Sequence, residues 1–279
     1  MSILDGLNSE QREAASIIDG PVLILAGSGS GKTRTITYRI AHMILEKGIS
    51  PSSILAVTFT NKAAKEMKER VEKLAGEHGA RVLVSTFHSF GVRMLRTYSE
   101  KAGLMSNFNI YDAGDQRTVV SKIMKSMKME AKEASKLTSK ISKLKEEGVT
   151  PDEYSGYAYS VQEKNFVEVY RKYCEELKKN NAIDFSDILL YTDILFRERE
   201  ILERAQDRFK YVMIDEYQDT NKIQYEIVKK LASKYRNICV VGDEDQSIYR
   251  FRGADIKNIL DFEKDYREAK VVKLERNYR

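Results

Sequence analysis

Residues 26–33, AGSGSGKT, have the residue types and the spacing of a phosphate-binding loop. Glycines let the backbone turn its N–H groups toward phosphate oxygens, and a helix that begins at the loop adds positive potential. In such a loop Lys32 reaches the β- and γ-phosphates, and the Thr33 hydroxyl binds Mg²⁺. The usual pattern starts with glycine, whereas this chain has Ala26, which is small enough for the same turn. The alternative is a chance glycine-rich turn. The site predicted here comprises Ala26, Gly27, Ser28, Gly29, Ser30, Gly31, Lys32 and Thr33.

Residues 211–219, YVMIDEYQD, supply two adjacent carboxylates at the end of an apolar run. Asp215 is predicted to hold Mg²⁺, and Glu216 to polarise the attacking water as a general base. An Asp-Glu pair alone usually marks a solvated turn, but beside a phosphate-binding loop it predicts hydrolysis of a nucleoside triphosphate. Small-molecule phosphotransferases use a similar loop, yet the adjacent glutamate suits activation of water better than transfer to another acceptor.

Short apolar, β-branched runs alternate with helical patterns, which predicts parallel strands joined by crossover helices. The spacing of Ile36, Ile40 and Met43 indicates one buried helix face that ends near Gly48, and a second pattern runs from Ala64 to Gly76. The expected fold is therefore an α/β sheet with helices on both faces. The predicted strands are 22–27, 54–60, 81–87, 211–215, 237–243 and 271–279.

The middle of the chain, residues 97–205, has helical periodicity and no convincing strand, so we predict an all-helical insertion. The flanking segments 1–96 and 206–279 then form one discontinuous domain. Within the insertion, residues 121–150 contain eight lysines against four glutamates, which favours a solvated helix surface and leaves contact with DNA phosphates as the alternative. Asp184 is interpreted as a helix cap.

The composition excludes several classes of protein. The net charge of +5 over 279 residues permits binding to a phosphate backbone but does not require it. Two cysteines offer no disulfide framework and no metal-ligand spacing. The longest apolar run, residues 22–26, is too short to span a membrane, and the first residues lack a signal peptide. We expect a cytoplasmic protein that does not contact membranes.

Beyond these two sites, further segments resemble the motifs of superfamily 1A DNA helicases of the UvrD/PcrA/Rep type, over essentially the whole chain. LNSEQREA (7–14) resembles the adenine-reading Q motif, and TFTNKAAKEM (58–67) resembles motif Ia. STFHSFGVRMLR (85–96) resembles motif Ib, VGDEDQSIYRFRGA (241–254) motif III, and LERNYR (274–279) motif IV. The resemblance implies a RecA-like, P-loop sheet with a helical insertion.

The resemblance also implies roles for single residues. Gln11 would read the adenine edge, and Arg34 and Tyr278 would enclose the ring; Gln246 would sense the γ-phosphate, and Arg279 would act as an arginine finger. The implied nucleic-acid contacts are Phe59, Asn61, His88, Tyr249, Phe251 and Arg252, with aromatic rings stacking on bases of any sequence.

These nucleic-acid residues have ordinary alternatives. Phe59 and Phe251 could be core residues, and His88 a buried structural histidine. Many relatives carry tryptophan at the position of Phe251. Asp243 and Asp245 could be simple turn residues.

As a whole, the resemblance implies an ATP- and Mg²⁺-dependent 3′–5′ DNA helicase or translocase that acts on single strands and single/double-strand junctions in DNA repair or replication. We expect these 279 residues to be a monomeric N-terminal fragment that lacks a second RecA-like domain and cannot unwind DNA alone. One alternative is a non-catalytic DNA-binding module; another is a helicase-nuclease subunit of the RecB or AddA kind.

Overall fold

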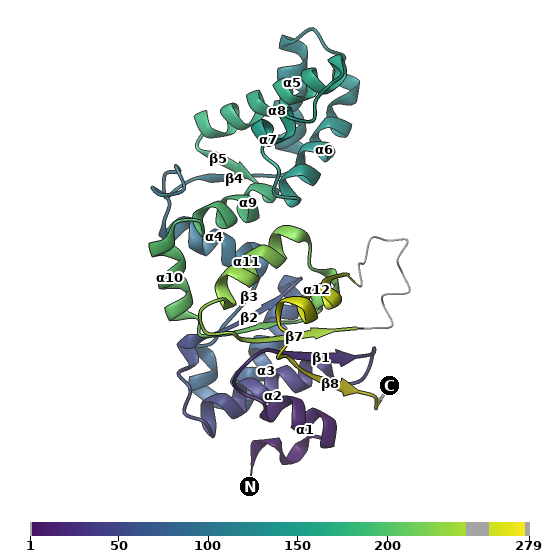
Figure 1. Cartoon of the computed structure of the whole chain (residues 1–279). Coiled ribbons are helices and arrows are strands. Elements are labelled where there is room, and N and C mark those ends of the chain that lie inside the picture. Colours follow the sequence, from purple (N-terminus) through teal and green to yellow (C-terminus); the bar gives the residue numbers. More distant parts are fainter. Residues whose placement is uncertain (1, 244–256, 277–279) are drawn as a thin grey trace. The chain divides into compact units, whose positions relative to one another are not determined.

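A six-stranded parallel sheet forms the centre of the computed structural model, which describes residues 2–243 and 257–276 (Figure 1). The strand order is β3-β2-β6-β7-β1-β8, and each neighbouring pair is parallel. All six strands expected from the sequence are present, and the predicted parallel α/β fold is confirmed. The strands are β1 (Val22–Ala26), β2 (Ile54–Thr58), β3 (Leu83–Thr86), β6 (Tyr211–Ile214), β7 (Asn237–Gly242) and β8 (Lys270–Leu274).

One face of the sheet is covered by α1 (Ser9–Ser16), α2 (Lys32–Leu45) and α3 (Asn61–Ala80). Ile36 and Ile40 of α2 and Met67 of α3 are buried in a cluster with every second residue of the strands, as side-chain alternation requires. The helix α3 kinks at Gly76, where φ is +60°, and then continues past its predicted end. Figure 1 shows α11 (Lys222–Ala232) and α12 (Lys257–Asp265) on the opposite face.

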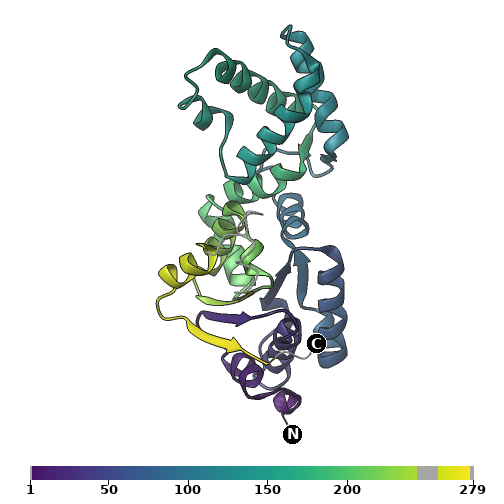
Figure 2. The ribbon, with the colours of Figure 1, turned by 90° about the vertical axis from the view of Figure 1, so that its right-hand side faces the viewer.

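Internal contacts divide the chain into two compact units, which Figure 2 shows from a second side. The first consists of residues 1–87, 199–220 and 227–279 and holds the sheet. It also contains α10 (Arg199–Arg208) and the short 3-10 helices η1 (Ile3–Gly6), η2 (Pro51–Ser53) and η4 (Tyr217–Asp219). The second unit consists of residues 88–198 and 221–226. The predicted domain division at residues 97–205 stays a prediction.

The second unit is mainly helical. Its core is formed by apolar residues of α5, α6 and α8, with Tyr170 and Tyr173 fully buried. The expectation of an all-helical insertion was wrong in one respect, because β4 (Asn109–Tyr111) and β5 (Ala182–Asp184) pair in parallel. Strands as short as these cannot produce a recognisable alternation. Its helices are α4 (Phe87–Thr97), α5 (Ala113–Ser126), η3 (Ala131–Glu133), α6 (Ala134–Glu146), α7 (Pro151–Ser155), α8 (Val161–Lys179) and α9 (Phe185–Leu195).

A buried ion cluster joins α6 to the start of α9. The Lys145 ammonium lies 2.6 Å from a carboxylate oxygen of Asp184 and 2.6 Å from one of Asp187, and its side chain is fully buried. The Tyr173 hydroxyl donates a hydrogen bond to Asp184 at 2.9 Å. Asp184 also caps α9, as predicted, by accepting from the Asp187 backbone N–H at 2.8 Å. One of the eight lysines noted in the sequence is thus a structural counter-ion, whereas the pattern suggested a solvated residue.

None of the helices in the part of the chain that the structure describes is long and apolar enough to cross a membrane.

Replacing Lys145 by methionine is expected to destabilise the protein by about 3–5 kcal/mol, because two buried carboxylates would lose their counter-charge. Urea unfolding followed by circular dichroism measures this change. Lys143→Met, at a side chain that is 79% exposed, is the matched control and should stay within about 0.5 kcal/mol of the wild type. Equal unfolding midpoints for the two variants would show that the cluster contributes nothing.

Candidate active site

The loop between β1 and α2 has the backbone conformation of an anion-binding turn. Gly29 and Gly31 adopt φ values of +83° and +89°, which favour glycine. The Ser30 backbone N–H and hydroxyl both donate to the Gly27 carbonyl, at 3.3 and 2.8 Å. Gly31 is the N-cap of α2, so the loop leads directly into the positive end of a 14-residue helix. This geometry suits phosphate oxygens, as the sequence pattern predicts.

The Lys32 ammonium lies between two carboxylates. Its Nζ atom donates to Glu216 Oε2 at 3.2 Å and to Asp243 Oδ2 at 3.1 Å. Only 11% of the Lys32 side chain is exposed, whereas 37% of Glu216 is exposed and Asp243 is fully buried. Burial alone would lower the pKa of Lys32, but attraction to Glu216 and the hydrogen bond to Asp243 outweigh it and raise that pKa. Lys32 therefore stays cationic at the edge of the sheet.

Asp215 is held beside Thr33 at the end of β6. Burial, followed by repulsion from Glu216, raises the pKa of Asp215 to about 6. The Glu216 backbone N–H donates to Asp215 Oδ1 at 3.0 Å, and a hydrogen bond involving the Thr33 side chain also favours the ionised form. The structure thus brings together Lys32, Thr33, Asp215 and Glu216, four of the side chains that the sequence assigned to triphosphate, metal and water.

Glu216 has a left-handed backbone, with φ 51° and ψ 46°. This conformation is costly for a residue with a side chain, and such strain is characteristic of functional sites. It turns the chain sharply from β6 into η4 and presents a part-exposed carboxylate next to the buried Asp215.

Two residues of this site had no functional assignment from the sequence. Asp243, directly after β7, was weighed only as a turn residue, yet it is a buried counter-ion of Lys32. Gln218, in η4, donates from Nε2 to Glu216 Oε2 at 2.7 Å and accepts from the Asp243 backbone N–H at 3.1 Å. The sequence signal for Asp243 was its position after an apolar strand of a parallel sheet, where carboxyl ends converge.

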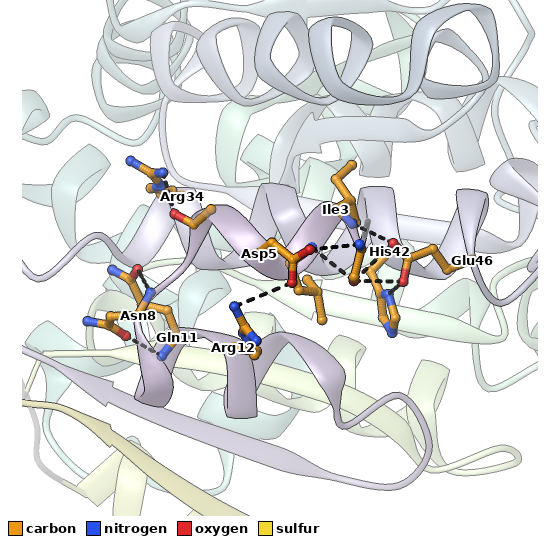
Figure 3. Close-up of polar contacts among 11 residues, drawn as sticks. Ile3, Asp5, Asn8, Gln11, Arg12, Arg34, His42 and Glu46 are labelled. Carbon is orange, nitrogen blue, oxygen red and sulfur yellow. Dashed lines mark hydrogen bonds and ion pairs between the residues drawn. The ribbon is translucent and has the colours of Figure 1, made fainter.

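Gln11 and Arg34 both belong to the group of polar contacts drawn in Figure 3. Gln11 belongs to the capping box of α1: its backbone N–H donates to Asn8 Oδ1 at 2.7 Å. Its side-chain Nε2 donates to the Ser30 carbonyl at 2.9 Å, which ties the helix to the phosphate-binding loop. Arg34 is exposed, donates to the Gly6 carbonyl at 2.8 Å, and lies 5.3 Å from the centre of the Tyr38 ring. Their roles at adenine stay predictions.

Phe59 and Asn61 follow the carboxyl end of β2. Phe59 is half-buried, and its ring meets Phe87 edge-on with centroids 5.6 Å apart. Asn61 is exposed at the first position of α3, where Thr60 caps the helix. Both residues lie on the same edge of the sheet as the loop because all strands run in parallel.

In the second unit, His88 stacks on Phe185, with ring centroids 3.7 Å apart and planes 18° apart. Burial lowers the pKa of His88 to about 4, so the ring is neutral near pH 7. Phe185, at the start of α9, is 55% exposed and had no assignment from the sequence. An exposed phenylalanine on a neutral ring forms a flat apolar surface and carries no charge for a phosphate.

Six predicted site residues lie outside the described residues. They are Gln246, Tyr249, Phe251, Arg252, Tyr278 and Arg279.

The donor set beside the loop fits a magnesium ion bound together with phosphates. Within residues 2–243 and 257–276, no group of three or more histidine, cysteine or acidic side chains could hold a metal by itself. Thr33 and Asp215 instead offer two hard oxygen ligands in contact with each other. Mg²⁺ ordinarily takes one or two protein ligands and completes its shell with phosphate and water.

The fold and this edge of the sheet define a P-loop α/β protein with a RecA-like sheet. Comparison with known families agrees: residues 7–267 match the model for the UvrD/REP helicase N-terminal domain. The chain belongs to the UvrD/REP helicase family.

Its relatives include proteins named ATP-dependent DNA helicase PcrA. The chain is 50% identical to the one from Staphylococcus epidermidis (strain ATCC 35984) and 49% identical to the one from Staphylococcus aureus (strain Mu50). Both similarities cover 100% of this chain and 38% of the relative, so the chain spans well under half the length of these helicases.

We predict that Asp215→Asn stabilises the protein at pH 8. The raised pKa of Asp215 means that the folded state binds more protons than the unfolded state between about pH 4 and 6. The contribution of Asp215 to the free energy of unfolding is therefore fully present below about pH 4 and is lost as the pH rises through about 6. Removing the charge should recover up to about 3 kcal/mol at pH 8 and little at pH 4.

Thermal unfolding from pH 4 to 8 measures this gain. Asp152→Asn, at a side chain that is 86% exposed, is the control and should show no such pH-dependent gain. A loss of stability in Asp215→Asn that is equal at all pH values would contradict the burial argument.

Proposed function

We propose that the chain binds ATP with Mg²⁺ and single-stranded DNA as part of a DNA helicase of the UvrD/PcrA type. The observation that carries this proposal is the Lys32 ammonium bound to Glu216 beside the N-terminus of α2. Triphosphate hydrolysis requires a cation that binds the phosphates and a nearby group that activates water, and Lys32 and Glu216 can supply the two. The names of the relatives support ATP and DNA as ligands.

In the proposed reaction, the loop amides and Lys32 neutralise the charge on the β- and γ-phosphates. Glu216 polarises the water that attacks the γ-phosphate, and its partial exposure leaves a path for that water. Thr33 and Asp215 would hold Mg²⁺, which supplies further neutralisation of phosphate charge when bound. Gln11 and Arg34 would contact the adenine.

The proposed DNA contacts use stacking more than charge. Phe59, His88 and Phe185 present rings that can meet any base, which suits an enzyme that binds strands without reading sequence. Because His88 is neutral near pH 7, its contribution should not depend on pH between 6 and 8. Tyr249, Phe251 and Arg252 join this set through the family motif.

Movement from 3′ to 5′, unwinding at a single/double-strand junction, and roles in repair or replication also belong to this proposal. So do the γ-phosphate sensor Gln246, the arginine finger Arg279 and the adenine contact Tyr278. The chain spans 38% of its helicase relatives, and these activities concern the whole enzyme.

Glu216→Gln should retain ATP binding, but its rate of phosphate release should fall at least about 100-fold, because an amide cannot accept the proton of the attacking water. Lys32→Ala should instead weaken ATP binding itself. Titration with a fluorescent ATP analogue and a phosphate-release assay with Mg²⁺ and oligo(dT) separate the two effects. Glu263→Gln, at an exposed residue of α12, is the control. A Glu216→Gln protein with wild-type hydrolysis would contradict the role of Glu216 as the general base. A wild-type protein that binds oligo(dT) but no ATP would contradict the proposal and favour a non-catalytic DNA-binding module.

Phe185→Ala should weaken binding of oligo(dT) by about 5- to 100-fold, the effect of losing one stacked base. Fluorescence anisotropy with labelled oligonucleotides measures the affinity, and oligo(dA) should show a similar loss. Tyr159→Ala, at a tyrosine that is 83% exposed in the same unit, is the matched control. Equal affinities for Phe185→Ala and the wild type would remove this ring from the DNA contacts.

A further inference from the structure

A buried glutamine connects the carboxyl ends of β6 and β7. Gln218 is only 3% exposed and lies in the short helix η4. Its Nε2 atom donates to Glu216 Oε2 at 2.7 Å, and its Oε1 atom accepts from the Asp243 backbone N–H at 3.1 Å. Both ends of one amide therefore contact residues that also bind Lys32.

The orientation of this amide is determined by its partners. A carboxylate can only accept a hydrogen bond and a backbone N–H can only donate one. The NH₂ group must face Glu216, and the carbonyl must face Asp243. Replacing glutamine by glutamate keeps the second contact and turns the first into repulsion.

Both contacts to the Glu216 carboxylate end on the same oxygen. Lys32 Nζ and Gln218 Nε2 each bind Oε2, and among the residues described no hydrogen bond ends on Oε1. Two donors on one oxygen fix the plane of the carboxylate and direct Oε1 away from both. A general base with one anchored oxygen keeps the other for water.

The turn that carries Gln218 is itself anchored. Tyr217 is buried, and its ring meets Phe262 of α12 edge-on with centroids 5.7 Å apart. Asn258, also in α12, donates from Nδ2 to the carbonyls of Gln218 and Thr220, at 3.4 and 2.6 Å. The amide of Gln218 is thus held from its backbone as well as from its side chain.

We propose that Gln218 is a positioning residue for hydrolysis: it orients the Glu216 carboxylate and ties it to the end of β7 at Asp243. This inference rests on the proposed role of Glu216 as the base. A buried glutamine that served stability alone would need hydrogen-bond partners, but any buried donor and acceptor would suffice. The partners of Gln218 are instead the proposed general base, Glu216, and the backbone of Asp243, whose side chain also binds Lys32.

Two substitutions test the two halves of the amide. Gln218→Leu removes both contacts and should lower kcat about 10-fold or more, with the KM for ATP changed less than about 3-fold, because orientation acts on the chemical step. Gln218→Glu should lose more activity at pH 8 than at pH 6. When the introduced carboxyl is protonated it donates to Glu216 again, whereas two ionised carboxylates repel each other.

The matched controls are Gln206→Leu and Gln206→Glu. Gln206 is 4% exposed and donates to the Lys230 carbonyl and the Ser233 hydroxyl, at 2.7 and 2.9 Å, away from the loop. Its variants should lose stability without a change in kcat per nucleotide-binding site and without the pH signature. Wild-type kcat and pH dependence in Gln218→Glu would overturn the inference.

A second measurement does not depend on turnover. In ¹H–¹⁵N spectra of the 279-residue chain, the Gln218 side-chain amide signals should move in Glu216→Gln, and the Asp243 amide should exchange faster in Gln218→Leu. The Gln206 signals should not move. Unchanged Gln218 and Asp243 signals would overturn the bridge even if the wild type hydrolyses no ATP, whereas active hydrolysis in Glu216→Gln would overturn the proposed function first.

Discussion

The site depends on one lysine held between two carboxylates of very different exposure. Lys32 binds Asp243, which is fully buried, and Glu216, which is 37% exposed. Glu216 follows the carboxyl end of β6, and Asp243 follows that of β7. The strand order β6-β7-β1 places the phosphate-binding loop, which follows β1, at the same edge of the sheet, so that Lys32 can contact both carboxylates. Burial alone would lower the pKa of Lys32, but attraction to Glu216 and the hydrogen bond to Asp243 together raise it and keep the ammonium charged. The exposed Glu216 is the partner that a polyphosphate could replace, because its carboxylate can be solvated when the contact is lost.

Several features at this edge cost stability. Asp215 is an ionised carboxyl in a buried position beside a second acid, and Glu216 is in a left-handed conformation. The sheet that carries them is buried on both faces, with β1, β2 and most of β6 and β7 inaccessible to solvent. A rigid apolar sheet can hold a strained and charged edge because its cooperative packing exceeds these local costs. The same balance explains why functional side chains gather where strands end and loops begin.

The sequence predicted the sheet well because its strands are continuous β-branched runs and its loop has an unusual pattern. It could not predict contacts between residues that lie far apart in the sequence. Lys145 belongs to a lysine-rich helix and differs from its neighbours by facing Asp184 and Asp187, which come much later in the chain. The strands β4 and β5 are too short for periodicity to show. Gln218 lies in the same segment as Asp215 and Glu216, but its proposed role depends on a hydrogen bond from the Asp243 backbone N–H. Those two residues are brought together only by the fold.

The ion clusters around Lys145 and Lys32 each pair one ammonium with two carboxylates, and they differ in burial and in the length of their contacts. Lys145 and its two aspartates are all buried to within 1%, and both ion pairs are 2.6 Å long. The Tyr173 hydroxyl adds a further hydrogen bond, so no partner can leave without stranding a charge. Such a cluster holds α6 and α9 together and offers nothing to a ligand. Around Lys32 the contacts are longer, at 3.1 and 3.2 Å, and one partner reaches solvent. An ion pair with one exposed member can exchange that member for another anion, and this difference supports the proposed binding of phosphate at Lys32.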